Sequence, residues 1–219
     1  MLNFIMFSVF YAVISVLLIR FYSSEDSGFY SLLKSTLESN RCRFYFVLLF
    51  VFSLTMLLWL DMGALYVVLA FLLLLALIDV ECLALPDVLN FLFLVVCMIC
   101  TFLHSSTMQE GYVERVLLGF GVGGVFFVLK ILYQGITRRD IIGDADIVVL
   151  SSVGITMGVV DGFASIFLGS VVALIYALFL RIFLKTKLLS LKLPFCFFIF
   201  VGILMNISNT VSWLFGWDM

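Results

Sequence analysis

Charged side chains are scarce in this sequence: 12% of its 219 residues are Asp, Glu, Lys or Arg, whereas 65% are hydrophobic. A soluble domain has about 25% charged residues and could not hide so much apolar surface from water. The formal net charge of −2 also excludes a strongly basic nucleic-acid-binding domain. The composition predicts an integral membrane protein, with the lipid bilayer around it and no nucleic acid among its partners.

Histidine and paired cysteines are scarce as well. His104 is the single histidine and is expected at the outer membrane boundary, so it cannot complete a Ser-His-Asp triad with acids on the other side. Cys97 and Cys100 have C-x-x-C spacing but lie in an apolar run, and a zinc site needs four ligands. We expect both cysteines to pack inside the membrane, and we predict no metal and no cofactor.

Long apolar segments, in contrast, fill the chain. Each crossing of a bilayer takes roughly 20 apolar residues. Runs bounded by charges and turn residues therefore predict an all-α bundle of about eight transmembrane helices, forming one membrane domain over residues 1–219. The expected spans are 2–20, 44–60, 63–79, 88–103, 113–133, 146–160, 162–182 and 193–215.

The cations indicate how this bundle is oriented. Lys and Arg are retained on the cytoplasmic side of a membrane. With the N-terminus outside, every cation except Arg115 falls at an inward-facing end or loop, of which the longest is 21–43. This segregation supports the count of spans, because dropping one helix would scramble it.

Glycines crowd the fifth predicted span. Gly119 and Gly123 have small-xxx-small spacing, which lets helix backbones approach closely in lipid. We expect them to pack within one bundle, with a dimer interface as the alternative.

Two acidic clusters share the predicted cytoplasmic side. Asp79 and Glu81 follow the third span, and Asp144 and Asp146 lead into the sixth. A carboxylate at the membrane boundary is costly and usually functional. Two carboxylates that meet can share a proton, so that one activates water while the other polarises a carbonyl, as in aspartic proteases. The alternatives are solvated loop acids and the ion sites of a proton-coupled transporter.

Three further residues lie beside these acids. Pro86 suits the first turn of a new helix, and Gly143 permits close backbone approach next to the second cluster. Asp87 is expected either to cap the fourth span, since acids favour helix N-termini, or to join Glu81 in orienting the acidic pair or a substrate.

The first cluster resembles a motif of the prepilin peptidases, which are polytopic aspartyl proteases of the GxGD type. In that family one catalytic aspartate begins a D-x6-P-[DN] stretch, which Asp79, Pro86 and Asp87 match. Leu193-Pro194-Phe195, at the start of the last span, is similar to the I-P-F segment of the same family. The resemblance extends over nearly the whole chain but is close only around Asp79.

The family's second catalytic aspartate ends a Gly-x-Gly-Asp motif, which is degenerate here. Gly143 lies three residues before Asp146, but an alanine replaces the glycine next to the aspartate. Family members also have glycines about eight and twelve residues further on. Counted from Asp146 these positions are Gly154 and Gly158, whereas those counted from Asp144 are not glycines. The spacing favours Asp146, and Asp144 is the alternative.

The resemblance implies an aspartic endopeptidase of the bacterial inner membrane, with Asp79 and Asp146 catalytic. It would cut the basic leader from prepilins or pseudopilins at the cytoplasmic face and so serve a type IV pilus or a secretion system. Many family members carry a double C-x-x-C zinc site in the first cytoplasmic loop, where this chain has Cys42 alone. The rival interpretations are a protease similar to signal peptide peptidase and a proton-coupled transporter.

Overall fold

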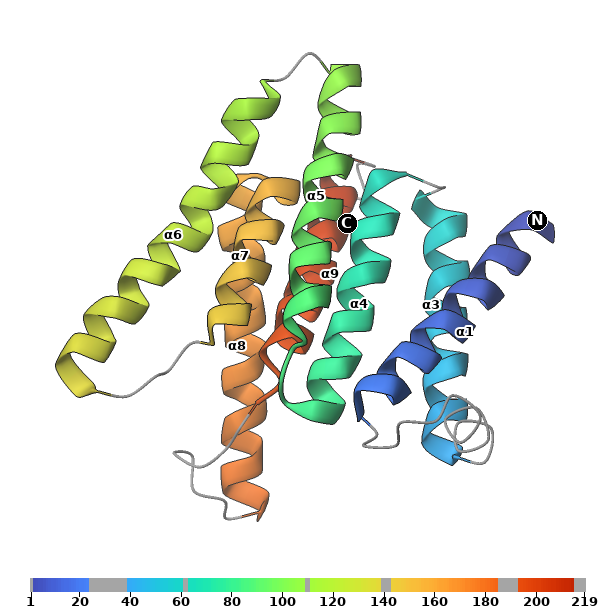
Figure 1. The fold of residues 1–219 in the computed structure, drawn as a ribbon, viewed down its shortest axis with the longest axis horizontal. Coiled ribbons are helices and arrows are strands. Elements are labelled where there is room, and N and C mark those ends of the chain that lie inside the picture. Colours follow the sequence, from blue (N-terminus) through green and yellow to red (C-terminus); the bar gives the residue numbers. More distant parts are fainter. Residues whose placement is uncertain are drawn as a thin grey trace.

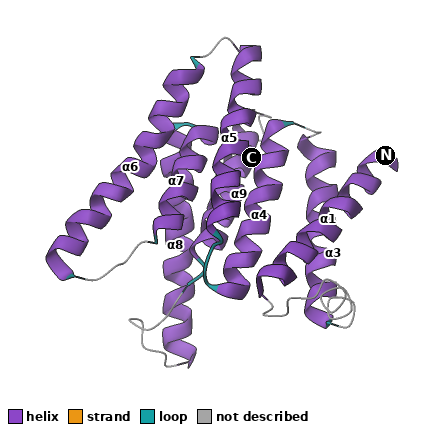
Figure 2. Ribbon diagram, in the orientation of Figure 1, coloured by secondary structure: helices purple, strands orange, loops and turns teal. Residues whose placement is uncertain are grey.

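The computed structural model describes residues 2–23, 39–60, 63–108, 111–138, 143–184 and 193–214. Those residues form helices and no strand (Figures 1 and 2). Each predicted span corresponds to one helix, so the protein is the expected polytopic all-α bundle. The helices are α1 (Leu2–Ser23), α3 (Asn40–Leu60), α4 (Ala64–Cys82), α5 (Asp87–Met108), α6 (Tyr112–Thr137), α7 (Asp144–Met157), α8 (Val159–Leu184) and α9 (Phe195–Leu214).

Several helices extend beyond their predicted spans. α4 continues to Cys82 rather than ending at residue 79, and α3 begins at Asn40 rather than at residue 44. An apolar run ends at the first charge, whereas the backbone hydrogen bonds of a helix continue past it. The loop expected over 21–43 is therefore shorter at both ends, and residues 24–38 of it lie outside the described part.

The helices differ in length. Five of those described are long and apolar enough to cross a membrane: Asn3–Ser23, Asn40–Trp59, Ala64–Cys82, Tyr112–Thr137 and Val159–Phe183. Asp87–Leu103 and Phe195–Ile207 are shorter apolar helices. α7 has only 14 residues, and at 1.5 Å per residue it is too short for a hydrocarbon core of about 30 Å. Its residues from Val149 to Ile155 are buried, which makes it an internal helix.

Five helices form a closed ring of contacts. α4 contacts α5, α5 contacts α7, α7 contacts α8, α8 contacts α9, and α9 returns to α4. α6 packs outside this ring against α7, while α1 and α3 pack together beside α4 (Figure 1). Cys97 and Cys100 of α5 are buried apolar packing residues, as predicted. His104 lies near the far end of α5, and its side chain is outside the described part.

The cations of the described residues gather at one end of the bundle. α1, α4, α6 and α8 end there, and α3, α5, α7 and α9 begin there (Figure 1). The predicted charge segregation therefore has a structural counterpart, with Arg115 at the opposite end, near the start of α6. The cations at the first end are Arg20, Arg41, Arg43, Lys130, Arg138 and Arg181.

Glycines bring α6 and α7 into close contact. A Cβ atom on Gly123 would overlap the side chain of Ser151, and one on Gly119 would overlap the main chain of Ile155. Gly154 of α7 approaches the carbonyl of Gly119 in return. The glycine spacing of the fifth span thus serves packing within the bundle, as expected.

A matched pair of substitutions tests this contact. Gly123→Ala should lower the free energy of unfolding by about 1–3 kcal/mol, because overpacking forces the helices apart. Gly121→Ala meets nothing within 4 Å, so it should be neutral or stabilising by up to about 1 kcal/mol, since alanine favours helix more than glycine does. Thermal unfolding of both variants in the same detergent checks the difference. Equal melting temperatures would contradict the close packing of α6 on α7.

Candidate active site

Asp79 is a buried carboxylate in the last turn of α4, with 7% of its surface exposed. Its Oδ2 accepts a hydrogen bond of 2.8 Å from the main-chain N–H of Cys196. Cys196 lies in the first turn of α9, where N–H groups lack a partner within the helix and favour negative charge. Asp79 is therefore held by the N-terminus of a distant helix and is not a solvated loop acid.

The chain turns sharply after Asp79. Leu83 has a left-handed φ of 50° and its N–H donates to the carbonyl of Asp79 at 2.8 Å, which ends α4. Pro86 precedes α5 and its carbonyl accepts the N–H of Asn90 at 3.0 Å. Asp87 is exposed in the first turn of α5, where its charge suits the positive end of the helix. The D-x6-P-D stretch thus begins in the last turn of α4, contains the turn between the helices and ends at the first residue of α5.

Asp146 lies in the first turn of α7 and is partly buried. Its Oδ2 accepts the main-chain N–H of Gly143 at 3.2 Å, so the side chain caps its own helix. A Cβ atom on residue 143 would lie only 3.1 Å from that oxygen. Gly143 therefore allows the close approach expected of it.

The two carboxylates occupy one site. Asp146 lies close enough to Asp79 for the two charges to interact. Asp79 comes from the end of α4 and Asp146 from the start of α7. The structure thus brings together the two acids that the sequence analysis paired.

Asp144 points elsewhere. Its side chain is 89% exposed and pairs with Lys130 of α6. Residues two apart on a helix do not share a face, so only one of Asp144 and Asp146 can face the ring. The geometry favours Asp146.

Glu81 does not reach the carboxylate pair either. Its Oε2 accepts the hydroxyl of Tyr45 at 2.7 Å, and its Oε1 lies 3.5 Å from the guanidinium of Arg41. Both partners belong to α3, so Glu81 links α4 to α3. With α4 continuing to Cys82, Glu81 lies on a different face of the helix from Asp79.

Comparison with known proteins adds one finding. The model of the type IV leader peptidase family matches residues 66–178, a little over half of the 219 residues. The chain belongs to this family. No curated protein and no solved structure matches the chain.

Membership of the type IV leader peptidase family makes this protein a membrane peptidase, as the resemblance implied. The matched residues include α7 and α4 from residue 66 onward, and therefore both acids of the pair. They end before α9, so the N–H that binds Asp79 comes from a segment outside the match.

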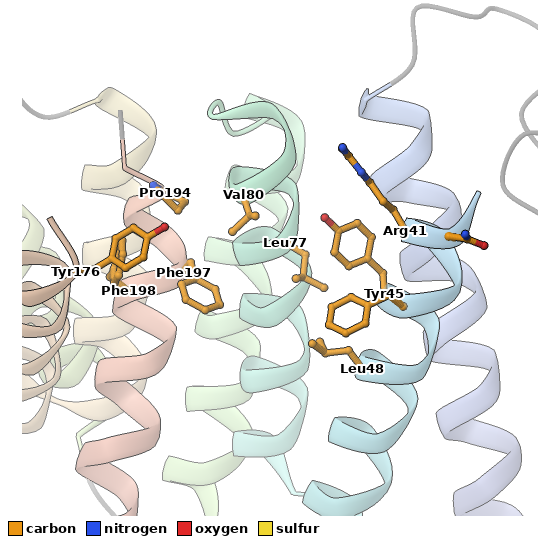
Figure 3. A pocket seen from close by; sticks show the side chains of 11 residues that line it. Arg41, Tyr45, Leu48, Leu77, Val80, Tyr176, Pro194, Phe197 and Phe198 are labelled. Carbon is orange, nitrogen blue, oxygen red and sulfur yellow. The ribbon is translucent and has the colours of Figure 1, made fainter. Parts of the chain in front are cut away.

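An apolar groove of about 730 Å³ lies on this leader peptidase between α3 and α9, across α4 (Figure 3). Leu77 and Val80 of α4 form its floor. Helical spacing puts Asp79 on another face of α4, so the groove and the carboxylate pair are separate features. The remaining lining residues include Arg41, Tyr45, Leu48, Tyr176, Pro194, Phe197 and Phe198.

Two residues of the site were not found from the sequence. The Cys196 N–H is a main-chain donor that any residue could supply, and only the helix start signalled by Leu193-Pro194-Phe195 pointed towards it. Asn90 donates from its Nδ2 to the carbonyl of Ala145, next to Asp146, at 2.9 Å. The only feature of the sequence that could have indicated a role for Asn90 is its position as a polar amide in an apolar run, just after the D-x6-P-D stretch.

The bond from Cys196 to Asp79 can be tested without any substrate. Asp79→Asn keeps an oxygen that can accept the Cys196 N–H, whereas Asp79→Leu leaves that buried donor unpaired at a cost of about 1–3 kcal/mol. We expect Asp79→Leu to melt at a lower temperature than Asp79→Asn in the same detergent. Equal melting temperatures for the two variants would count against this bond.

Proposed function

We propose that this family member is an aspartic endopeptidase in which Asp79 and Asp146 are the catalytic residues. The observation that carries the proposal is that a buried acid of α4 and a partly buried acid of α7 lie within range of each other's charge at one end of the bundle. Each accepts a main-chain N–H at the start of a helix. Repulsion between their charges favours a state in which the pair holds one proton, as an aspartic protease requires.

The pair would act on the peptide bond as a general acid and a general base. The ionised carboxylate takes a proton from water, and the water oxygen adds to the scissile carbonyl carbon. The protonated carboxyl donates its proton to the carbonyl oxygen. When the C–N bond then breaks, the departing nitrogen takes the proton that was removed from water. A hydroxyl of the tetrahedral intermediate gives its proton to the other carboxylate, so the two carboxyls share one proton again.

The proposed substrate is a prepilin or pseudopilin in the bacterial inner membrane. Asp79 and Asp146 lie at the end of the bundle where the cations gather, and cations favour the cytoplasmic side. A leader with basic residues in the cytoplasm and an apolar helix in the bilayer would bring its boundary to this level. The cut at that boundary would release the leader into the cytoplasm.

Substitution of the three aspartates tests the assignment. In a strain without other prepilin peptidases, we expect Asp79→Asn and Asp146→Asn each to lower leader removal at least about 10²-fold, the typical worth of acid–base catalysis. Asp144→Asn is the matched control, because the Asp144 side chain is 89% exposed and its only described partner is Lys130, and it should remain active. A gel shift of a co-expressed prepilin measures each variant.

The possible results separate the alternatives. Processing that survives both Asp79→Asn and Asp146→Asn would refute the catalytic pair. Loss with Asp144→Asn and survival with Asp146→Asn would transfer the second catalytic role to Asp144. Western blots of membrane fractions must show equal amounts of each variant, because a misfolded protein would imitate a catalytic defect.

A further inference from the structure

Asn90 connects the two segments that carry the acidic pair. It lies in the first turn of α5, just after the turn that follows Asp79, and it is buried, with 1% of its surface exposed. Its Nδ2 donates a 2.9 Å hydrogen bond to the carbonyl of Ala145 in the first turn of α7. Ala145 is the residue before Asp146, so the bond holds the backbone from which the second carboxylate extends.

The same side chain keeps an unpaired acceptor. Asn90 Oδ1 is buried and has no hydrogen-bond partner among the described residues. Reversing the amide would place this oxygen against the carbonyl of Ala145, so the bond to Ala145 fixes which way the amide points. Leaving a buried acceptor without a partner costs at least as much stability as one hydrogen bond contributes on balance. The Asn90 amide therefore contributes little or nothing to the stability of the fold, which indicates another role.

Removal of the Asn90 amide would not leave the carbonyl of Ala145 without a hydrogen-bond partner. Ala145 lies within α7, and the register of an α-helix pairs its carbonyl with the N–H four residues later. Leucine has a volume similar to that of asparagine plus one methyl group and brings no polar atom. Asn90→Leu should consequently be tolerated by the fold better than most changes at a buried polar position.

We propose that Asn90 is a positioning residue for Asp146: by holding the main chain at Ala145 against α5, it fixes the second carboxylate relative to the first. This inference rests on the proposed function of the pair. The hydrogen bond from Asn90 to Ala145 is expected to affect the rate of the chemical step, because catalytic groups must be held in a narrow geometry for proton transfer. It contributes little to binding of the substrate's apolar helix.

The structure contains a matched control in the same pair of helices. Thr101 is also buried on α5, and its Oγ1 donates to the carbonyl of Ile155 on α7 at 3.3 Å. α5 and α7 run in the same direction, so this second bond lies near the opposite end of α7, far from the acids. Thr101→Val removes a similar cross-helix bond without touching the start of α7.

The experiment compares Asn90→Leu and Thr101→Val in purified full-length protein with a synthetic prepilin. We expect Asn90→Leu to keep the melting temperature but to lower kcat at least about tenfold with KM little changed, whereas Thr101→Val keeps kcat. Amide hydrogen exchange should become faster in the peptide covering residues 143–150 of Asn90→Leu and stay unchanged there in Thr101→Val.

Each outcome decides one question. Unchanged kcat and unchanged exchange in Asn90→Leu would overturn the positioning role while leaving the catalytic pair intact. A fall in kcat that parallels a fall in melting temperature, equal in both variants, would also overturn it, because that is the result of a purely structural bond. If the wild type fails to cleave any prepilin, the proposed function fails, and the exchange data alone decide whether Asn90 fixes the start of α7.

Discussion

The organising constraint of this molecule is that two carboxylates must be kept inside an apolar bundle. A buried charge is costly unless it is paired or hydrogen-bonded, and a membrane bundle has few side-chain donors to offer. The first turn of a helix, however, has N–H groups without partners in the helix. Asp79 uses that of α9 through Cys196, and Asp146 uses the N–H of Gly143 at the start of its own helix. The site can therefore exist only where helices begin.

This requirement explains the topology around the site. α4 ends where α5, α7 and α9 begin, so one acid comes from a helix end and the donors come from helix starts at the same level (Figure 1). α7 must then be part of the ring of helices although it is only 14 residues long. The glycines of α6 allow α6 to cover α7 closely, and Gly158, with a φ of 85°, ends α7 before α8 begins. Packing glycines far from the acids thus help to place Asp146.

The sequence predicted the helices and the acidic pair because both depend on local signals: apolar runs, charges at their ends, and fixed spacings of proline and glycine. It did not predict what depends on helix phase. Glu81 lies in the same cluster as Asp79, but α4 continues past both and directs Glu81 towards Tyr45 of α3. The donor at Cys196 is a main-chain group, and the role of Asn90 depends on two helices meeting in space, so neither leaves a pattern along the chain.

The contacts of Asp146 also explain why alanine can replace the second glycine of the Gly-x-Gly-Asp pattern at position 145. Gly143 leaves room for the Asp146 carboxylate, because a Cβ atom at this position would lie 3.1 Å from its Oδ2. The second glycine position of the motif, occupied by Ala145, contributes its carbonyl, which Asn90 binds, and any residue has a carbonyl. Its side chain is half-buried rather than enclosed, so the methyl group of Ala145 finds room there. The first glycine of the motif is thus in close contact with the acid, whereas at the second glycine position the contact that helps to hold Asp146 is made by the main chain, which alanine also supplies.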